Sequence, residues 1–140
     1  MVFYTKPQRR NMLFNNEALK SDEFNIPYIL WVYKTNSLSI YALKKKPTKE
    51  TDVLYRAPFF NTSANGSVCM GNVYFKNRTG KIDGFSDQLQ ELFFNSIFTH
   101  TNNNELATEN IIELYEKAKS KDFVWDKYLL KTKLTLKDVL

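Results

Sequence analysis

The sequence predicts an α+β fold, with strands in the first half of the chain and helices in the second. Runs of β-branched and aromatic residues dominate before residue 75, whereas apolar residues recur at helical spacing after residue 85. The chain has 140 residues and is 43% hydrophobic, which suits a single domain covering residues 1–140. Because strands precede helices, we expect an antiparallel meander sheet of about four strands, with the C-terminal helices packed on one side.

A β-hairpin is the clearest local prediction. Residues 28–34 form a continuous run of strand-forming residues, and residues 37–43 alternate between apolar and polar positions. Thr35 and Asn36 between these runs are the two residues of a tight turn. Further extended segments are expected at residues 2–4, 11–14, 53–55 and 68–75, the last of them entered through the turn dipeptide Asn65-Gly66.

Helices are predicted in the second half from capping residues and apolar spacing. Ser86 is the expected N-cap of a first helix, whose apolar positions continue to Ile97. Thr108 is the expected cap of a second helix, in which Ile111, Ile112, Tyr115 and Ala118 form one apolar stripe. The remaining expectations are a strand or a loop anchor at Phe123-Val124-Trp125 and a short terminal helix in residues 134–140 that begins at Thr135.

The positive charge is concentrated at the N-terminal side. The net charge is +5, and residues 1–60 contain ten Lys or Arg against five Asp or Glu. Arg9-Arg10 and Lys44-Lys45-Lys46 are the main basic clusters. A basic face can dock nucleic acid or an acidic protein, but lysines also protect exposed strand edges against aggregation. The sequence favours the second interpretation, so nucleic-acid binding is the less favoured possibility.

Several functional classes are excluded by composition. No apolar run approaches the roughly 20 residues of a membrane span, and the N-terminus lacks the order of a secretory signal. A single cysteine allows no internal disulfide and suits a reducing compartment, so we expect a cytoplasmic protein. Neither metal-ligand spacing nor a glycine-rich phosphate loop is present, so no metal and no cofactor are expected.

Cys69 is the candidate reactive residue. It follows the Asn65-Gly66 turn, and in an extended segment Val68 and Met70 point to one side while Cys69 points to the other. If Val68 and Met70 face the core, the thiol faces solvent. The alternative is an inert buried thiol, because free cysteine is among the most buried residue types.

Asn61 is the candidate partner of Cys69, eight residues before it. Its side-chain amide is able to donate to an oxyanion that develops on an attacked carbonyl. The alternative is a turn residue that bonds its own backbone. Arg56 is placed to hold an anion or the tail of a partner, or else it ends a strand. A Cys69–His100 dyad of a thiol protease is disfavoured, because His100 lies at the expected end of a helix.

Asn61 and Val68-Cys69-Met70 resemble the active-site segment of ubiquitin-conjugating-enzyme (UBC-like) domains. The chain is more closely similar to the bacterial UBC-like family D, known as PRTRC system protein B, over nearly all of its length. The matching segments are Trp31, residues 38–44, Ala57-Pro58-Phe59-Phe60-Asn61, Gly66-Ser67-Val68-Cys69-Met70-Gly71, Phe93-Phe94-Asn95-Ser96 and Thr135-Leu136-Lys137. Full-length relatives resemble this chain only in their C-terminal part, which implies a longer family architecture.

The resemblance implies a UBC-like fold and a thiol carrier of a bacterial mobile-element system. Cys69 would accept a ubiquitin-like modifier from an activating enzyme, and Asn61 would stabilise the oxyanion or hold the loop. Phe59-Phe60 replaces the His-Pro pair that precedes this asparagine in eukaryotic members, and Arg56 and Met70 would support the site. The alternative is a non-catalytic UBC-like adaptor that binds protein or nucleic acid through its basic N-terminal half.

Overall fold

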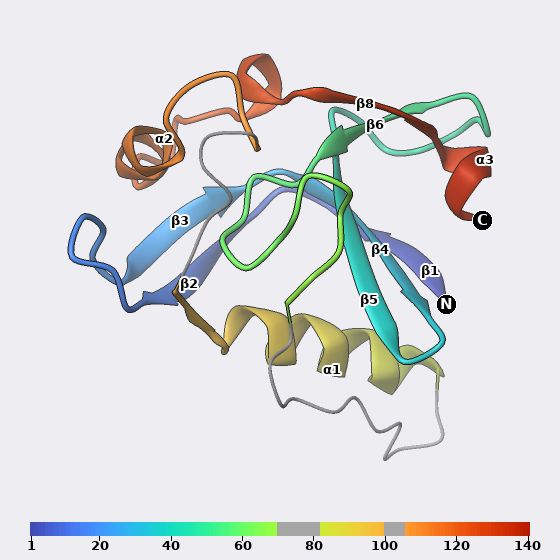
Figure 1. Cartoon of the computed structure of the whole chain (residues 1–140), viewed down its shortest axis with the longest axis horizontal. Helices are drawn as coiled ribbons and strands as arrows, with labels where there is room; N and C mark the ends of the chain where they lie inside the picture. The colour runs from blue at the N-terminus through green and yellow to red at the C-terminus, as the bar shows by residue number, and fades with distance from the viewer. Residues whose placement is uncertain (70–81, 100–105) are drawn as a thin grey trace.

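The computed structural model describes residues 1–69, 82–99 and 106–140, and in these ranges the chain is a mixed α+β protein with two sheets (Figure 1). A five-stranded antiparallel sheet has the order β1-β4-β5-β6-β8, and a three-stranded sheet has the order β3-β2-β7. The strands are β1 (Val2–Thr5), β2 (Gln8–Phe14), β3 (Asp22–Ile26), β4 (Tyr28–Lys34), β5 (Ser37–Leu43), β6 (Val53–Arg56), β7 (Ile97–Phe98) and β8 (Lys131–Thr135). The helices are α1 (Ile82–Phe94), α2 (Ile111–Ala118), the 3-10 turn η1 (Asp126–Tyr128) and α3 (Leu136–Val139). None of the helices in the described ranges is long and apolar enough to cross a membrane.

The predicted hairpin is confirmed as β4 and β5, which pair from Tyr28↔Leu43 to Lys34↔Ser37. Its turn residues Thr35 and Asn36 have φ angles of 52° and 60°, as a two-residue type I′ turn requires. Alternate residues of β4 enter two different apolar clusters, one on each face of the sheet. A strand that is buried on both faces needs apolar residues at every position, which explains the continuous run in the sequence.

The sheet topology differs from the expected meander. Strands β4, β5 and β6 are consecutive in both sequence and space, but β1 pairs with β4, and β8 joins at the far edge beside β6. The chain between β1 and β4 forms the β2–β3 hairpin of the second sheet. The sequences of β3 (DEFNI) and β8 (KTKLT) have a low intrinsic preference for strands. These strands form because neighbouring strands and covering segments stabilise them more than their own propensity does.

The first two helices begin at other residues than predicted. Helix α1 starts at Ile82, so Ser86 lies inside the helix and is not its N-cap. Helix α2 is capped by Asn110, whose side chain accepts hydrogen bonds from the N–H groups of Ile112 and Glu113. The N–H of Thr108 instead donates to the carbonyl of Tyr128 at 2.9 Å, so Thr108 is not the cap.

The terminal helix is confirmed as α3, which begins after Thr135. Thr135 and Asp138 form a reciprocal capping box, in which the Thr135 N–H donates to the Asp138 carboxylate at 2.7 Å. The segment at residues 123–125 is a loop anchor rather than a strand. Trp125 is 2% exposed, and its indole N–H donates to the carbonyl of Asn25 at 2.6 Å.

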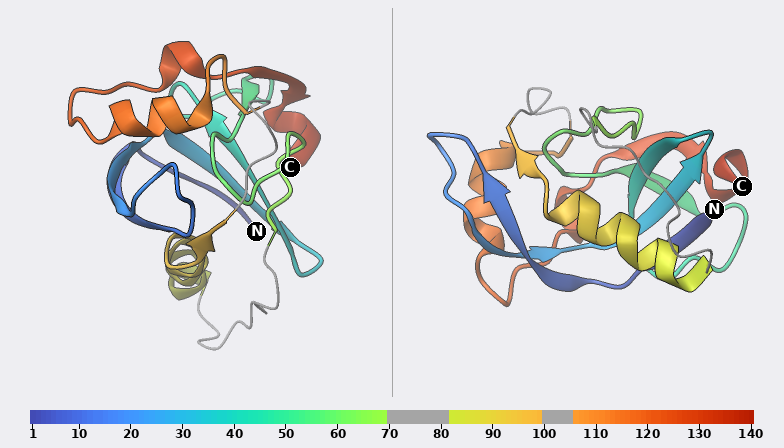
Figure 2. Two further views of the ribbon diagram at one scale, coloured as in Figure 1. Left: turned by 60° about the vertical axis from the view of Figure 1, so that its left-hand side comes forward. Right: turned by 90° about the horizontal axis from the view of Figure 1, so that it is seen from below.

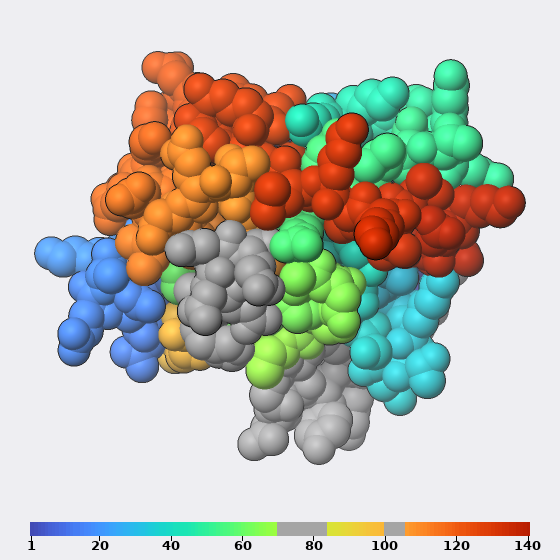
Figure 3. Space-filling model, turned by 45° about the horizontal axis from the view of Figure 1, so that its top comes forward, coloured from blue at the N-terminus to red at the C-terminus, as the bar shows by residue number. Residues whose placement is uncertain are grey.

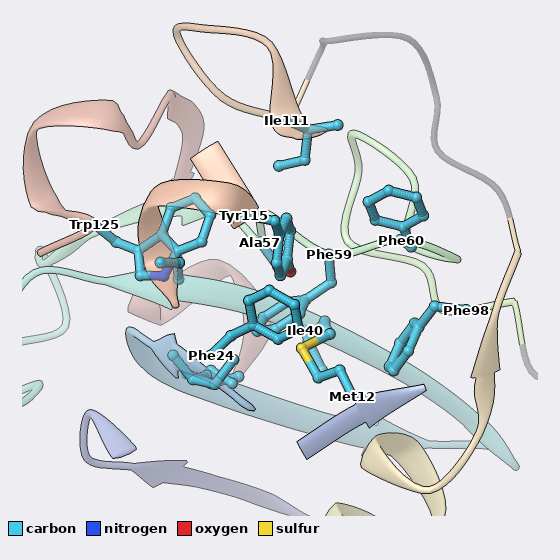
Figure 4. Packing of buried hydrophobic residues seen from close by; sticks show 14 of the residues in the cluster. Met12, Phe24, Ile40, Ala57, Phe59, Phe60, Phe98, Ile111, Tyr115 and Trp125 are labelled. Atoms are coloured by element: carbon cyan, nitrogen blue, oxygen red, sulfur yellow. The ribbon is translucent and has the colours of Figure 1, made fainter. Parts of the chain in front are cut away.

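The helices do not all pack on one side of the five-stranded sheet. Helices α1 and α2 lie on opposite sides of β2 and β3 (Figures 1 and 2), and both contribute to the main core cluster with Trp31 and Ile40. Helix α3 covers the other face, where Val139 packs with Leu30 and Tyr41. The main core is strongly aromatic, and Figure 4 shows rings from β3, α2 and the segment after β6 meeting in it.

Candidate functional site

The candidate site begins where β6 ends and the chain turns across the core. Phe59 and Phe60 in this turn are both fully buried (Figure 4). The ring of Phe60 packs edge-on against Tyr115 of α2, and the buried Tyr115 hydroxyl donates to the carbonyl of Pro58 at 2.6 Å. Burial raises the pKa of Tyr115 well above its ordinary value, so this hydroxyl stays a proton donor. Aromatic packing therefore fixes the turn that precedes Asn61.

Asn61 links this turn to the segment after α1. Its backbone has a φ of 61°, in the left-handed region that asparagine tolerates better than most residues. Its Nδ2 donates to the carbonyl of Ile97 at 3.1 Å, and its Oδ1 accepts from the N–H of Thr99 at 3.3 Å. These are the two bonds that a residue of a neighbouring parallel strand would make on either side of Phe98. The side-chain amide of Asn61 thus takes the place of the backbone of a further strand next to β7, and in this way it extends the β2–β7 pair.

The loop from Thr62 to Cys69 continues the large sheet beyond the end of β6. The Val68 N–H donates to the carbonyl of Leu38 at 3.1 Å, and the Ile40 N–H donates to the carbonyl of Gly66 at 2.9 Å. The loop closes on itself because the Cys69 N–H donates to the carbonyl of Asn61 at 2.7 Å. In the space-filling view this light-green loop lies at the surface beside the cyan hairpin of β4 and β5 (Figure 3).

The Asn65-Gly66 turn in this loop is confirmed. The Asn65 side-chain oxygen accepts from the Ser67 N–H at 3.0 Å, and Gly66 has a φ of 93°. Behind the turn stands Tyr41, whose hydroxyl donates to the carbonyl of Asn65 at 3.1 Å. Burial raises the pKa of Tyr41, so this bond persists at neutral and mildly alkaline pH. Only glycine fits at position 66, because a Cβ there would lie 2.7 Å from the Tyr41 ring.

Cys69 is exposed, and Val68 before it packs against the main core. This placement agrees with the expected alternation along the segment. The structure brings Cys69 and Asn61 together through the backbone bond, while the Asn61 side chain reaches towards Ile97 and Thr99. Met70 and His100, the other candidate residues from the sequence, lie outside the described residues.

Arg56 is the last residue of β6 and pairs with Tyr41 of β5. Its backbone N–H donates to the carbonyl of Leu130 at 2.8 Å, which joins the strand to the segment before β8. Arg56 therefore lies at the end of the strand, which is one of the two roles expected for it from the sequence.

Two contributions to the site were not predicted from the sequence. Nothing in the sequence around Tyr41 predicts that its ring lies behind Gly66. The apolar spacing predicts that Ile97 belongs to the first helix, but α1 ends at Phe94 and Ile97 starts β7, where it is 58% exposed. The Asn95-Ser96 pair after α1 was the available signal, because both residues favour turns over helix interiors.

The two N-terminal arginines make contacts inside the molecule. Arg9 forms an ion pair with Glu23 at 2.5 Å and also donates to the carbonyl of Lys119 at 3.0 Å. Arg10 forms an ion pair with Glu91 at 3.0 Å and lies 4.8 Å from the centre of the Phe94 ring. Both arginines therefore tie the small sheet to helices.

Residues 1–134 match the family described as prokaryotic E2 family D, and the chain belongs to this family. No curated protein and no solved structure gives a significant match. Family membership indicates a role like that of ubiquitin-conjugating enzymes, and the mixed fold with its antiparallel sheet is compatible with such a domain. Within the three described ranges, no group of His, Cys, Asp or Glu side chains is arranged to hold a metal ion.

Proposed function

We propose that this protein carries a ubiquitin-like modifier as a thioester on Cys69. The Cys69 thiolate would attack the thioester carbonyl of a charged activating enzyme, forming a new C–S bond and releasing the enzyme's thiolate. A substrate amine would then attack the carrier thioester, forming an amide bond, and the Cys69 thiolate would leave. The amine's proton would pass to solvent or to the thiolate.

The observation that carries this proposal is the exposed thiol on a fixed loop in a member of an E2 family. The Cys69 backbone is held by the 2.7 Å bond to the Asn61 carbonyl, and the loop is bonded to β5 through Leu38 and Ile40. A carrier thiol needs access for the modifier's C-terminal tail and a stable position relative to an incoming amine. Exposure supplies the first requirement and the loop bonds supply the second.

In this scheme Asn61 is a positioning residue first. Its amide is engaged with the backbone of Ile97 and Thr99, which favours the loop-holding role over oxyanion donation. The buried Phe59 and Phe60 anchor the same turn from the other side. Arg56 would contact the modifier's tail or an anion, and Met70, which follows Cys69 in the sequence, would support the site.

The test is a charging reaction with purified components. The protein is mixed with ATP, the activating enzyme and the ubiquitin-like protein encoded near it, and the products are separated without reductant. We expect an adduct of one modifier per chain that dithiothreitol removes. Cys69→Ala should form no adduct, and Cys69→Ser should give none or an oxyester that resists dithiothreitol.

The control is the activating enzyme itself, which must form its own thioester with the modifier in the same tube. If that enzyme is charged while this protein stays unmodified, the carrier function is wrong. If an adduct persists in Cys69→Ala, the acceptor is another residue. A PRTRC-type mobile-element setting is part of the same proposal, and it requires that the cognate modifier and activating enzyme be encoded in such a system.

A non-catalytic adaptor is the alternative, with the basic N-terminal half as its binding surface. Arg9 and Arg10 pair with Glu23 and Glu91. The exposed Lys44-Lys45-Lys46 cluster, in which Lys45 also pairs with Asp52, is therefore the part of this surface to test. Replacing the three lysines by glutamine should then abolish partner binding, while Cys69→Ala leaves it intact. The reverse pattern supports the carrier.

A further inference from the structure

The peptide unit between Asn65 and Gly66 is held at both of its polar groups. Its N–H, on Gly66, donates to the carbonyl of Ser63 at 3.0 Å. Its carbonyl, on Asn65, accepts from the hydroxyl of Tyr41 at 3.1 Å. The N–H and the carbonyl of a trans peptide unit are fixed in one plane and point in opposite directions. Rotation of this unit would therefore break both hydrogen bonds, and the Tyr41 hydroxyl is the only side-chain group of the two partners.

The orientation of this peptide unit matters because glycine permits several backbone conformations. Gly66 has a φ of 93°, but glycine adopts positive and negative φ with similar ease. From Gly66 the chain runs three residues to Cys69, and on this path Gly66 and Val68 form backbone bonds with Ile40 and Leu38 of β5. A different φ at Gly66 would send this short path, and Cys69 at its end, in another direction.

Tyr41 is a firm support for the turn because its own ring is held in place by packing. The residue is 6% exposed and belongs to the cluster with Leu30 and Val139, which α3 covers. Val68 of the loop packs against the main core on the other face of the sheet. The loop is therefore held from both faces, by Val68 on one and by the Tyr41 hydroxyl on the other. Side chains that are locked by packing are those that can keep a site in one geometry.

We propose that Tyr41 is a positioning residue of the Cys69 site. Its hydroxyl fixes the Asn65–Gly66 peptide unit, and thereby the direction in which a thioester on Cys69 is presented to a substrate amine. This inference rests on the proposed carrier function. Amine attack needs a defined approach to the thioester carbonyl, so a loop that samples several conformations transfers the modifier more slowly. Reactions that need only an exposed thiol do not depend on the hydroxyl.

Two matched variants isolate the hydroxyl. Tyr41→Phe removes it and keeps the ring that packs in the cluster. Tyr28→Phe is the control, because Tyr28 packs against the same cluster from β4. None of the hydrogen bonds among the described residues joins the Tyr28 side chain to the loop. Both variants retain an aromatic ring at the substituted position, so we expect both to fold.

The first test measures the motion of the loop in the uncharged protein by NMR relaxation of the backbone N–H groups. In Tyr28→Phe the order parameters of Gly66 and Cys69 should stay near about 0.85, the value of rigid backbone. In Tyr41→Phe they should fall towards about 0.6, while those of β4 stay unchanged. A role in stability alone would lower the free energy of unfolding without changing this native-state motion. Equal order parameters of the loop in the two variants overturn the proposal.

The second test follows the discharge of a preformed Cys69 thioester to free lysine in a single turnover. Tyr41→Phe should transfer the modifier about three- to tenfold more slowly than Tyr28→Phe, the range expected for one lost hydrogen bond. Both variants should react with iodoacetamide at the same rate, because alkylation requires only the exposed thiol.

The outcomes separate this inference from the carrier function. Equal discharge rates of the two variants would overturn the positioning role of Tyr41 and leave the carrier function intact. If the wild-type chain stays uncharged beside a charged activating enzyme, the carrier function is wrong, and the positioning role in transfer is wrong with it.

Discussion

The ring of Tyr41 occupies the space that a side chain on Gly66 would need, with Cε1 only 2.7 Å from the position of a Cβ. The same tyrosine donates its hydroxyl to the Asn65 carbonyl, so it both supports the turn and limits it to glycine. A buried strand residue thereby sets the path of the loop that leads to Cys69.

Gly66→Ala should destabilise the protein by about 2–4 kcal/mol, because the variant adds strain at a φ of 93° and overpacks the turn against a buried ring. Urea unfolding measures the change. Ser67→Ala is the control in the same turn, where the side chain is exposed and the expected change is within about 0.5 kcal/mol. Equal stability of the two variants would mean that the turn moves away from Tyr41 at little cost.

Asn61→Gly should lower the free energy of unfolding by about 1–3 kcal/mol, because the Ile97 carbonyl and the Thr99 N–H lose their partner. Asn61→Ala should cost about 1 kcal/mol more, since alanine adds strain at a φ of 61° that glycine does not. Thermal and urea unfolding of both variants separate the two effects. Unchanged stability combined with slow amine transfer would instead assign the amide to the oxyanion.

Glu91→Gln should remove an acid-dependent part of the stability. The hydrogen bond from Arg10 holds the pKa of Glu91 below its ordinary value of 4.5. The charged pair therefore stabilises the fold above pH 4.5, and its contribution is lost as the pH falls through the lower folded-state pKa. The contribution is under about 1 kcal/mol, because the Glu91 side chain is 58% exposed.

The measurement is the difference in unfolding free energy between wild type and Glu91→Gln at pH 7 and at successively lower pH values below 4.5. The difference should shrink towards zero at the acid end. Glu17→Gln on the exposed β2–β3 turn is the control, and its difference should be small throughout. A difference in unfolding free energy between wild type and Glu91→Gln that grows as the pH falls would contradict a stabilising Arg10–Glu91 pair.

Native Cys69 should react to completion with iodoacetamide, because its side chain is exposed and the chain has no other thiol. Mass spectrometry should show a single added group without denaturant. The alkylation rate should not change in sub-denaturing urea, since no opening step is needed. Protection that disappears only on unfolding would identify a buried structural thiol.

The sequence was most informative where local chemistry decides the structure. The Thr35-Asn36 turn, the Asn65-Gly66 turn and the helix start at Thr135 each depend on backbone or side-chain preferences of neighbouring residues, and all three are confirmed. The exposure of Cys69 and the packing of Val68 agree with strand alternation, and they decide between the exposed and the buried thiol that the sequence left open.

The features that sequence reasoning missed depend on distant partners. Asn110 replaces Thr108 as a cap, since the N–H of Thr108 is engaged with Tyr128. Strand β8 forms from a lysine-rich segment because β6 presents an edge to it. The contact of Asn61 with Ile97 spans 36 positions, and no local pattern encodes it.

That long span also has a kinetic meaning. Closing a loop of many residues costs conformational entropy before the contact at its ends stabilises the chain. Contacts of high sequence separation therefore tend to form late in folding. The loop that carries Cys69 would acquire its final shape only after the chain up to Thr99 has been synthesised and docked. Under the proposed carrier function, a nascent or partly folded chain would have the thiol but not the loop that holds it, so loading of a modifier would wait until the segment up to Thr99 has docked.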